Sequence, residues 1–371
     1  PTRRSSDLIN QDWATSPATG LAWSVAEIDA LEIGARGTVV GARVIEVAEY
    51  DVQVTYSTGP DFVLAGNFVA GNSLTATFAG NFDIGGFFQI GNTPTVNISG
   101  NADVGGTFTV GNGPGSITLG NELDIVGNML FGNSMTATFG GVTTLGANMT
   151  FGTATTLTTN NTLDVTGNVT FGTGANVLTF NNDVTVGGNV SVGVGGNVGT
   201  FNLPHDFNVT GSFTAGNNGT FTFDVVVIGT TATFGTGATV TTATSFQSGG
   251  NTTFDTGGNR NLGEATIGGS LSVGAGGAAG PFAADPVTIT NNVIVGNTPT
   301  ANFGSGGGAS FVTIGGNATF GNGAGNVNFN AETTITGNLV VGNSLNVTFS
   351  DGQGDDSTIG GLVTLGNNNV F

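Results

Sequence analysis

Residues Gly132–Phe151 read GNSMTATFGGVTTLGANMTF, and they contain the pattern on which most of the chain is built. Three short segments alternate apolar and polar residues, and Gly- and Asn-rich turns separate them. Alternation with a period of two is typical of a β-strand with one buried side. Three such strands bury too little apolar surface to fold alone, so the unit predicts stacking on copies of itself.

The unit recurs along the chain, and each copy opens at a residue that follows an apolar position. The openings are Gly71, Gly91, Gly111, Gly132, Gly152, Gly172, Gly193, Gly216, Gly235, Asp255, Gly274, Gly296, Gly321, Gly342 and Gly366. From 71 to 366 there are 295 residues in 14 intervals, or about 21 residues per unit. Two earlier units are expected near Asp29–Glu49 and Tyr50–Ala70.

Apolar residues predict where the strands of each unit end. The first strand is expected to end at Phe78, Ile98, Leu119, Phe139, Phe180, Phe201, Phe223, Phe282, Phe303, Phe329 and Phe349. The third is expected to end at Phe131, Phe151, Phe171, Phe234, Phe254 and Phe320. In the middle strand, an inward pair flanks one polar residue, as Leu123 and Ile125 flank Asp124.

These units predict an all-β fold, a parallel β-solenoid with three short strands per coil. Each strand would pair with its copy in the next coil, about 4.8 Å away, which makes a rod on the order of 70 Å long from 14 coils. Gly, Asn and Thr are poor helix formers, which argues against helical repeats. A propeller blade needs about twice this length. A right-handed solenoid is favoured by the general twist of strands.

Solenoid repeats are predicted over residues 29–371, and they are clear from residue 71. Residues 9–28 contain both tryptophans and are expected to form an N-terminal cap or junction. Residues 1–8 read PTRRSSDL, which resembles one reading frame of a common sequencing adapter. They are therefore expected to be foreign to the natural protein, whose true start would then be missing. The alternative is a disordered basic tail.

Composition and charge narrow the range of partners. The chain has 67 Gly, no Cys and a net charge of −19, with only 8% charged residues. So acidic a chain argues against binding nucleic acid, which needs Lys and Arg to replace counterions, and against an anionic membrane surface. It contains no run of 18 apolar residues, so no membrane-spanning helix is expected. A rod covered with Thr, Asn, Ser and Gly suits an extracellular or cell-surface location.

An Asn recurs three residues before the end of the unit. The set comprises Asn67, Asn128, Asn148, Asn168, Asn189, Asn251, Asn292, Asn317 and Asn338. Asn in the same turn of successive coils can bond its amide to the Asn above and below. We expect a structural ladder whose side chains point inward.

Acidic residues repeat at the outward position of the middle strand: Asp83, Asp103, Asp124 and Asp164. Thr144 fills the gap, and Asp183 and Asp206 are expected nearby. Stacked coils would place these carboxylates about 4.8 Å apart. Two interpretations stay open: a solvated row of charge, or a row bridged by a hard cation such as calcium. No other cofactor is expected.

Other candidates for chemistry are few. His205 is the only histidine and lies between Pro and Asp in the sequence, as a solvated turn residue would. Arg260 is the only Lys or Arg after Arg43, so no acid–base set for cleaving a polysaccharide can be assembled. Thr-x-Thr pairs such as Thr75/Thr77 and Thr136/Thr138 resemble the arrays of ice-binding proteins. They do not recur in successive units of the sequence, which argues against that interpretation.

The repeats GNVTFGTG (167–174), NNDVTVGGNVSVG (181–193) and NATFGNGAGNVNF (317–329) resemble those of bacterial β-strand-repeat surface proteins. These include autotransporter passengers and filamentous-haemagglutinin-like adhesins. The resemblance covers roughly residues 50–371 and implies a surface stalk, adhesin or fibre. It assigns no functional residue.

Three functions follow as hypotheses. The first is a non-enzymatic subunit of an extracellular filament or surface fibre, assembling with itself head-to-tail through the solenoid ends. The alternative is a monomeric adhesin stalk that presents a binding tip to an unidentified host or cell-surface ligand. The remote alternative is a polysaccharide-active β-helix enzyme.

Overall fold

The computed structural model describes residues 44–47, 53–55, 61–304, 310–350 and 356–371, and every regular element in them is a β-strand. The expected adapter-like segment 1–8 and the expected cap 9–28 lie outside the described residues, as does most of the unit Asp29–Glu49. Unit Tyr50–Ala70 contributes three strands.

Each coil has up to three strands, whose bounds are as follows. The first strands are β2 (Gln53–Thr55), β5 (Thr75–Phe78), β8 (Thr95–Ile98), β11 (Ser116–Leu119), β14 (Thr136–Phe139), β17 (Thr156–Thr159), β20 (Val177–Phe180), β23 (Thr200–Leu203), β26 (Thr220–Ile228), β28 (Thr239–Ser248), β30 (Arg260–Asn261), β33 (Pro281–Ala284), β36 (Thr300–Phe303), β39 (Gly325–Phe329) and β42 (Leu345–Phe349). The middle strands are β3 (Phe62–Leu64), β6 (Phe82–Ile84), β9 (Ala102–Val104), β12 (Leu123–Ile125), β15 (Thr143–Leu145), β18 (Leu163–Val165), β21 (Val184–Val186), β24 (Phe207–Val209), β31 (Glu264–Ile267), β34 (Val287–Ile289), β37 (Phe311–Ile314), β40 (Glu332–Ile335) and β43 (Thr358–Ile359). The third strands are β1 (Val44–Val47), β4 (Asn67–Ala70), β7 (Phe88–Ile90), β10 (Phe108–Val110), β13 (Met129–Phe131), β16 (Met149–Phe151), β19 (Val169–Phe171), β22 (Val190–Asn197), β25 (Phe213–Asn217), β27 (Ala232–Phe234), β29 (Thr252–Phe254), β32 (Leu271–Ala278), β35 (Val293–Asn297), β38 (Ala318–Phe320), β41 (Leu339–Val341) and β44 (Val363–Leu365).

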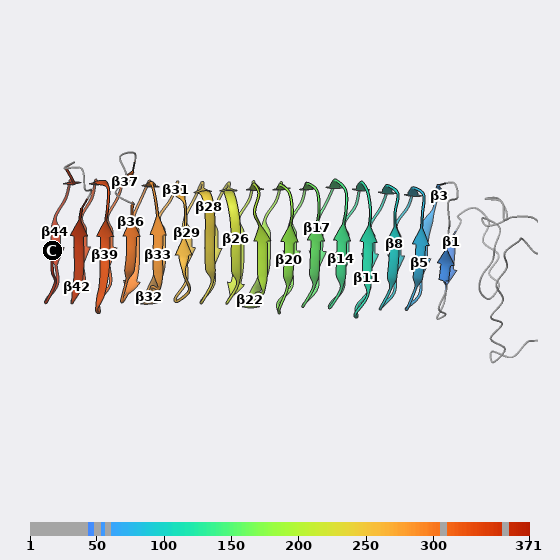
Figure 1. The fold of residues 1–371 in the computed structure, drawn as a ribbon, viewed down its shortest axis with the longest axis horizontal. Coiled ribbons are helices and arrows are strands. Elements are labelled where there is room, and N and C mark those ends of the chain that lie inside the picture. The colour runs from blue at the N-terminus through green and yellow to red at the C-terminus, as the bar shows by residue number, and fades with distance from the viewer. Residues whose placement is uncertain (1–43, 48–52, 56–60, 305–309, 351–355) are drawn as a thin grey trace, which may run out of the picture.

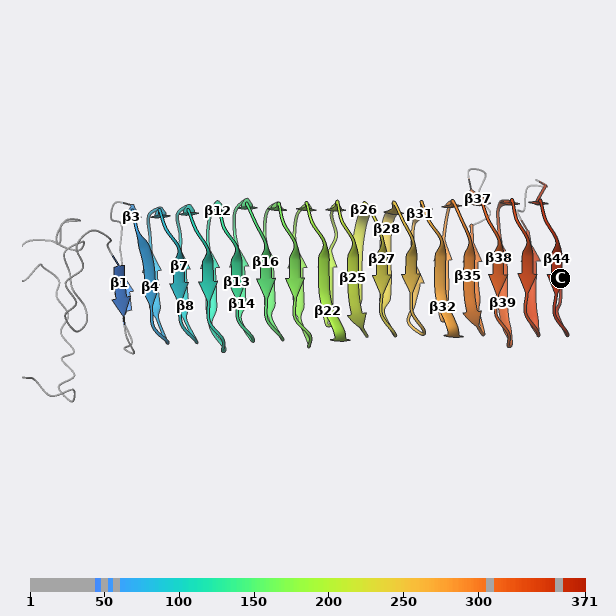
Figure 2. The same cartoon turned by 180° about the vertical axis from the view of Figure 1, so that it is seen from behind.

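Strands of successive coils pair in parallel and build two long sheets. The third strands form a 16-stranded sheet in which β1 and β44 are the outermost members. The first and middle strands form a 28-stranded sheet, and β26 and β28 each run through both positions. Figures 1 and 2 show the coils stacked in one straight row from both sides. The predicted parallel β-solenoid is confirmed, with about 20 residues per turn and three strands per coil.

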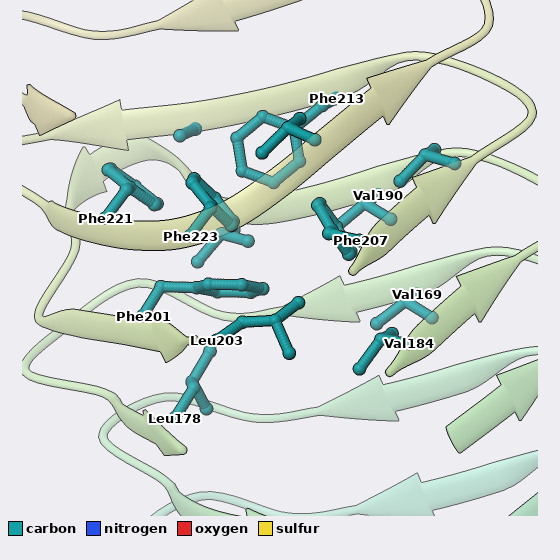
Figure 3. Packing of buried hydrophobic residues seen from close by; sticks show 14 of the residues in the cluster. Val169, Leu178, Val184, Val190, Phe201, Leu203, Phe207, Phe213, Phe221 and Phe223 are labelled. Atoms are coloured by element: carbon teal, nitrogen blue, oxygen red, sulfur yellow. The ribbon is translucent and has the colours of Figure 1, made fainter. Parts of the chain in front are cut away.

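The lumen is filled with apolar side chains because alternate residues of every strand point inward. Phe rings stack from coil to coil: the centroids of Phe131 and Phe151 lie 4.6 Å apart with an interplanar angle of 3°. Figure 3 shows the same packing around Phe207 and Phe223, whose centroids lie 5.5 Å apart. Large and small residues alternate along a strand, as in Phe213 and Ala215, which keeps the lumen evenly filled.

Most of the predicted strand ends are confirmed. The six residues predicted to end third strands do so, and Phe78, Phe139 and Phe329 end first strands. The prediction is wrong for Phe201 and Phe282, which lie at an earlier inward position of β23 and β33. It is also wrong for Phe223, because β26 continues beyond it to Ile228. Third strands β22 and β32, in the preceding coils, are eight residues long, and these extra residues shift the start of the next strand.

The turn that opens each coil explains the recurring Gly. A Cβ atom on Gly132 would lie only 2.5 Å from the carbonyl oxygen of Gly111 in the coil below, so only Gly fits at this spacing. Two residues later the backbone takes the left-handed conformation, with φ of 59° at Ser134. Gly occupies the same place in other coils, as at Gly113 and Gly174.

Candidate functional site

The predicted acidic row lies in register on the outward side of the middle strands. Asp103 pairs with Asp83 on one side and with Asp124 on the other. Thr144 separates Asp124 from Asp164. All four carboxylates are exposed. The row is therefore open to solvent along one side of the rod.

The middle carboxylate of three in a line, Asp103, has a shifted pKa. Partial desolvation raises the pKa of the Asp103 carboxyl above its ordinary value, and the charges of Asp124, Asp83 and Glu122 raise it further. In such a line the carboxylates do not surround a common point, as the ligands of a metal ion would. Within the described residues, no group of three or more His, Cys, Asp or Glu is placed to hold a metal ion. Calcium bridging between neighbouring coils stays a prediction.

Asp183 and Asp206 do not continue the row. Its next positions are taken by Thr185 and Asn208. Asp183 and Asp206 precede their middle strands instead, and the backbone N–H of Asp206 donates to the Asp183 carboxylate at 3.2 Å. The Asp183 side chain therefore joins the turns of two neighbouring coils.

The predicted Asn residues stack at the turn before the third strand. The Asn168 side-chain oxygen accepts the backbone N–H of Asn189 at 2.7 Å, and the Asn189 oxygen accepts that of Ser212 at 2.8 Å. The same bond joins Asn292 to Asn317, and Asn317 to Asn338. Each oxygen thus fixes the backbone of the following coil.

Two details of the Asn expectation need correction. Bonds between side chains occur at only some steps, such as Asn148 Nδ2 to Asn128 Oδ1 at 3.1 Å. The predicted inward orientation is wrong, because Asn148, Asn168 and Asn189 are exposed. The lumen is apolar, and an amide there would lose the water and backbone partners that it has at the turn.

A second Asn row was missed at the turn that opens each unit. The Asn92 side-chain oxygen accepts the backbone N–H of Asn112 at 2.7 Å, and the Asn112 oxygen accepts that of Asn133 at 2.9 Å. Near the C-terminal end, Asn322 and Asn343 repeat the contact at 2.8 Å. The signal was present in the sequence as recurrent Gly-Asn pairs.

Arg260 lies inside the lumen, where the pattern predicts an apolar residue. Its side chain is 1% exposed and pairs in register with Val240 and Phe282. The guanidinium donates to the carbonyl oxygens of Asp255, Gly258 and Ala279 and lies 5.7 Å from the Phe254 ring centroid. Desolvation lowers the pKa of Arg260 to about 10, so the group stays charged at neutral pH.

The outward side of the first strands carries two straight rows of mostly hydroxyl side chains, which we call the hydroxyl face. The first row contains Thr75, Thr95, Ser116, Thr136, Thr156, Val177, Thr200, Thr220 and Thr239. The second contains Thr77, Asn97, Thr118, Thr138, Thr158, Thr179, Asn202, Thr222 and Thr241. The expectation that Thr-x-Thr pairs do not recur in successive coils is wrong for two pairs of neighbouring coils: Thr136/Thr138 lie beside Thr156/Thr158, and Thr220/Thr222 lie beside Thr239/Thr241. In four other coils Asn, Ser or Val takes the place of one Thr.

His205 is exposed in the turn between β23 and β24. No hydrogen bond of its side chain appears among the described residues. Within the described part of the chain, no helix is long and apolar enough to cross a membrane.

Comparison with protein families, with curated proteins and with solved structures finds no match to this chain.

Proposed function

We propose that this chain is a non-enzymatic structural protein located outside the cell. It would act as the repeating subunit of a filament or surface fibre, with copies stacked head-to-tail. The observation that carries the proposal is the continuous parallel pairing of the 16-stranded sheet from β1 to β44, in which the register shifts only within the β22–β25 and β32–β35 pairs. A rod built in this way is stiff along its axis, since backbone hydrogen bonds join each coil to the next.

The interior supports a mechanical role. The void lined by Phe171, Phe180 and Phe201 measures about 10 Å³, which is at most the space of one water molecule. Polar side chains at the turns are bound to the next coil, as Asn189 is to Ser212. The buried residues and the turns therefore stabilise the stack.

The last coil supports the head-to-tail joint. Val363, Leu365 and Phe371 are 40%, 44% and 61% exposed, although Leu339 and Val341, which pair with Val363 and Leu365 in the previous coil, are buried. The Phe371 ring lies 5.6 Å from Phe349 and continues the ring stack. A further parallel coil would bury these side chains. We propose that a second copy supplies that coil through its β1–β3 end. A continuation of the same chain is the rival source.

Electron microscopy of the purified chain at increasing concentration tests the proposal. Sixteen coils at about 4.8 Å give a subunit on the order of 75 Å long. We expect rods that lengthen in multiples of this value. Particles of one subunit length at high concentration would contradict the filament and favour the monomeric adhesin stalk. Cleavage of a polysaccharide panel would favour the enzyme.

A pair of variants makes the test specific. Leu365→Asp places a charge on the inward side of the exposed edge strand β44, and it should stop elongation because the joint would bury that charge. Thr364→Asp adds the same charge one residue away on the outward side of the same strand, and it should elongate like the parent chain. Equal elongation by both variants would mean that this edge is not the joint.

A further inference from the structure

The hydroxyl face is a two-dimensional lattice. Neighbouring coils place equivalent residues about 4.8 Å apart, and positions two apart on one strand lie about 6.6 Å from each other. In a single coil, Thr136 and Thr138 give the spacing along the strand. Thr138 and Thr158 give the spacing between coils. Three-residue strands of the 16-stranded sheet, such as β16 and β19, present one outward residue each and therefore a single row.

The groups of this lattice are not used by the fold. Among the described residues, no hydrogen bond involves the side-chain hydroxyl of Thr136, Thr138 or Thr220, and these side chains reach solvent. The polar groups at the turns differ, since there each Asn oxygen binds the next coil. Thr is also stiff at χ1, so a Thr row presents hydroxyl and methyl groups in few orientations.

The face is uncharged over its whole length. From Thr75 to Thr241, its two rows contain only Thr, Ser, Asn and one Val. The acidic row lies on the middle strands instead. A charged polymer would therefore find no electrostatic attraction on this face. The chemistry favours a neutral occupant that is itself a regular array of hydrogen-bonding oxygen atoms.

A single hydroxyl of this kind gives no affinity in water, because a bond to a ligand replaces an equally good bond to solvent. Only an occupant that meets many hydroxyls at once gains from the array, as in multivalent binding. Such an occupant must be rigid and must repeat with nearly the spacing of the face. Ice is a rigid, uncharged lattice whose oxygen atoms both donate and accept hydrogen bonds, as hydroxyl groups do, and water ordered on the face would become part of the crystal.

We propose that the hydroxyl face binds ice. This activity goes beyond the filament role and does not depend on it. A straight rod of this length would bind along one side, so that the bound water forms a strip that follows the axis of the solenoid (Figure 1).

The test is partition of the purified chain into a slowly growing ice front, together with inhibition of ice recrystallisation. The double variant Thr138→Lys/Thr158→Lys disrupts the centre of the face, and it should be rejected from ice like an inert protein. The control Thr150→Lys/Thr170→Lys makes the same change in the same two coils on the 16-stranded sheet. It should partition like the parent chain. Equal urea midpoints for both variants show that folding is unaffected.

Rejection of the parent chain from ice would overturn the proposal, as would equal partition of the two double variants. A third arm uses crystalline cellulose as another neutral lattice. Binding of the parent chain to cellulose without enrichment in ice would mean that the face recognises a polysaccharide surface, and the proposal would be wrong.

Discussion

Asp103 lies between the carboxylates of two neighbouring coils, so removing its charge should stabilise the fold. We expect Asp103→Asn to raise the free energy of unfolding at pH 7 by about 0.2–1 kcal/mol, the range for side-chain pairs directly opposite each other in a sheet. The pKa of this carboxyl is raised in the folded state above 3.8. Below 3.8 the gain is therefore absent, and it becomes complete as the pH rises through the raised pKa. Urea unfolding across this pH range measures it.

Asp164→Asn is the matched control, since Asp164 has Thr144 and Thr185 as its neighbours instead of carboxylates. Equal gains from both variants would contradict the repulsion argument. The same variants separate the two interpretations of the acidic row. A bridging calcium ion predicts a larger rise in melting temperature than sodium at equal ionic strength, with the excess lost in Asp103→Asn. A solvated row predicts equal rises in both salts.

Asn189 holds the following coil through its side-chain oxygen. Asn189→Ala removes the acceptor of the Ser212 N–H, and we expect a loss of about 0.5–1.5 kcal/mol. Hydrogen exchange at the Ser212 amide should become faster, while Asn189→Asp, which keeps an acceptor, should protect it. Asn97→Ala is the control, because the Asn97 side chain has no hydrogen bond among the described residues. Unchanged exchange at Ser212 in Asn189→Ala would show that the bond does not stabilise the turn.

Strand β30 is only two residues long, and one of the two is the buried Arg260. Its guanidinium is the donor for three carbonyl oxygens. We expect Arg260→Met to lower the free energy of unfolding by about 2 kcal/mol, because unpaired buried carbonyls cost more than the apolar side chain returns. Val240→Met, at the same inward position of the previous coil, should cost less. A more stable Arg260→Met protein would show that the desolvation of the charge dominates.

The predictable part of this structure is the part governed by alternation. Inward Phe and outward Asp follow directly from a period of two, so Phe131 and Asp103 lie where the sequence places them. Contacts between coils depend on the register, which insertions alter. The extra residues of β22 and β32 move Phe201 and Phe282 away from the predicted strand ends. Thr136 and Thr156 stand at the same place in two units without such insertions, and the pairing places them in one row. Alternation predicts an apolar residue in the lumen, so it does not predict Arg260 there. One of the carbonyl groups that accept from this guanidinium belongs to Ala279, one coil away, and the sequence does not show that contact.

The two ends of the 16-stranded sheet predict which residues would meet in a head-to-tail contact. Pairing places Glu46 and Thr364 in the same register at opposite ends of the 16-stranded sheet. Ile45 and Val47 correspond in the same way to Val363 and Leu365. A second copy that continues the stack would therefore set Thr364 beside Glu46 at about the strand spacing of 4.8 Å, within the Cα separation that a disulfide spans.

The chain has no Cys, so the double variant Glu46→Cys/Thr364→Cys has no competing thiol. Under mild oxidation we expect a ladder of covalent multimers on a non-reducing gel, because the contact is heterologous and propagates. Thr364→Cys alone can form at most dimers. Glu46→Cys/Val363→Cys moves one thiol to the inward side and should cross-link poorly, since a shift of one residue turns the side chain to the other face of the sheet. If Glu46→Cys/Thr364→Cys forms filaments but no covalent multimers, the two ends meet in another register. A chain that forms neither filaments nor ladders would refute head-to-tail assembly itself.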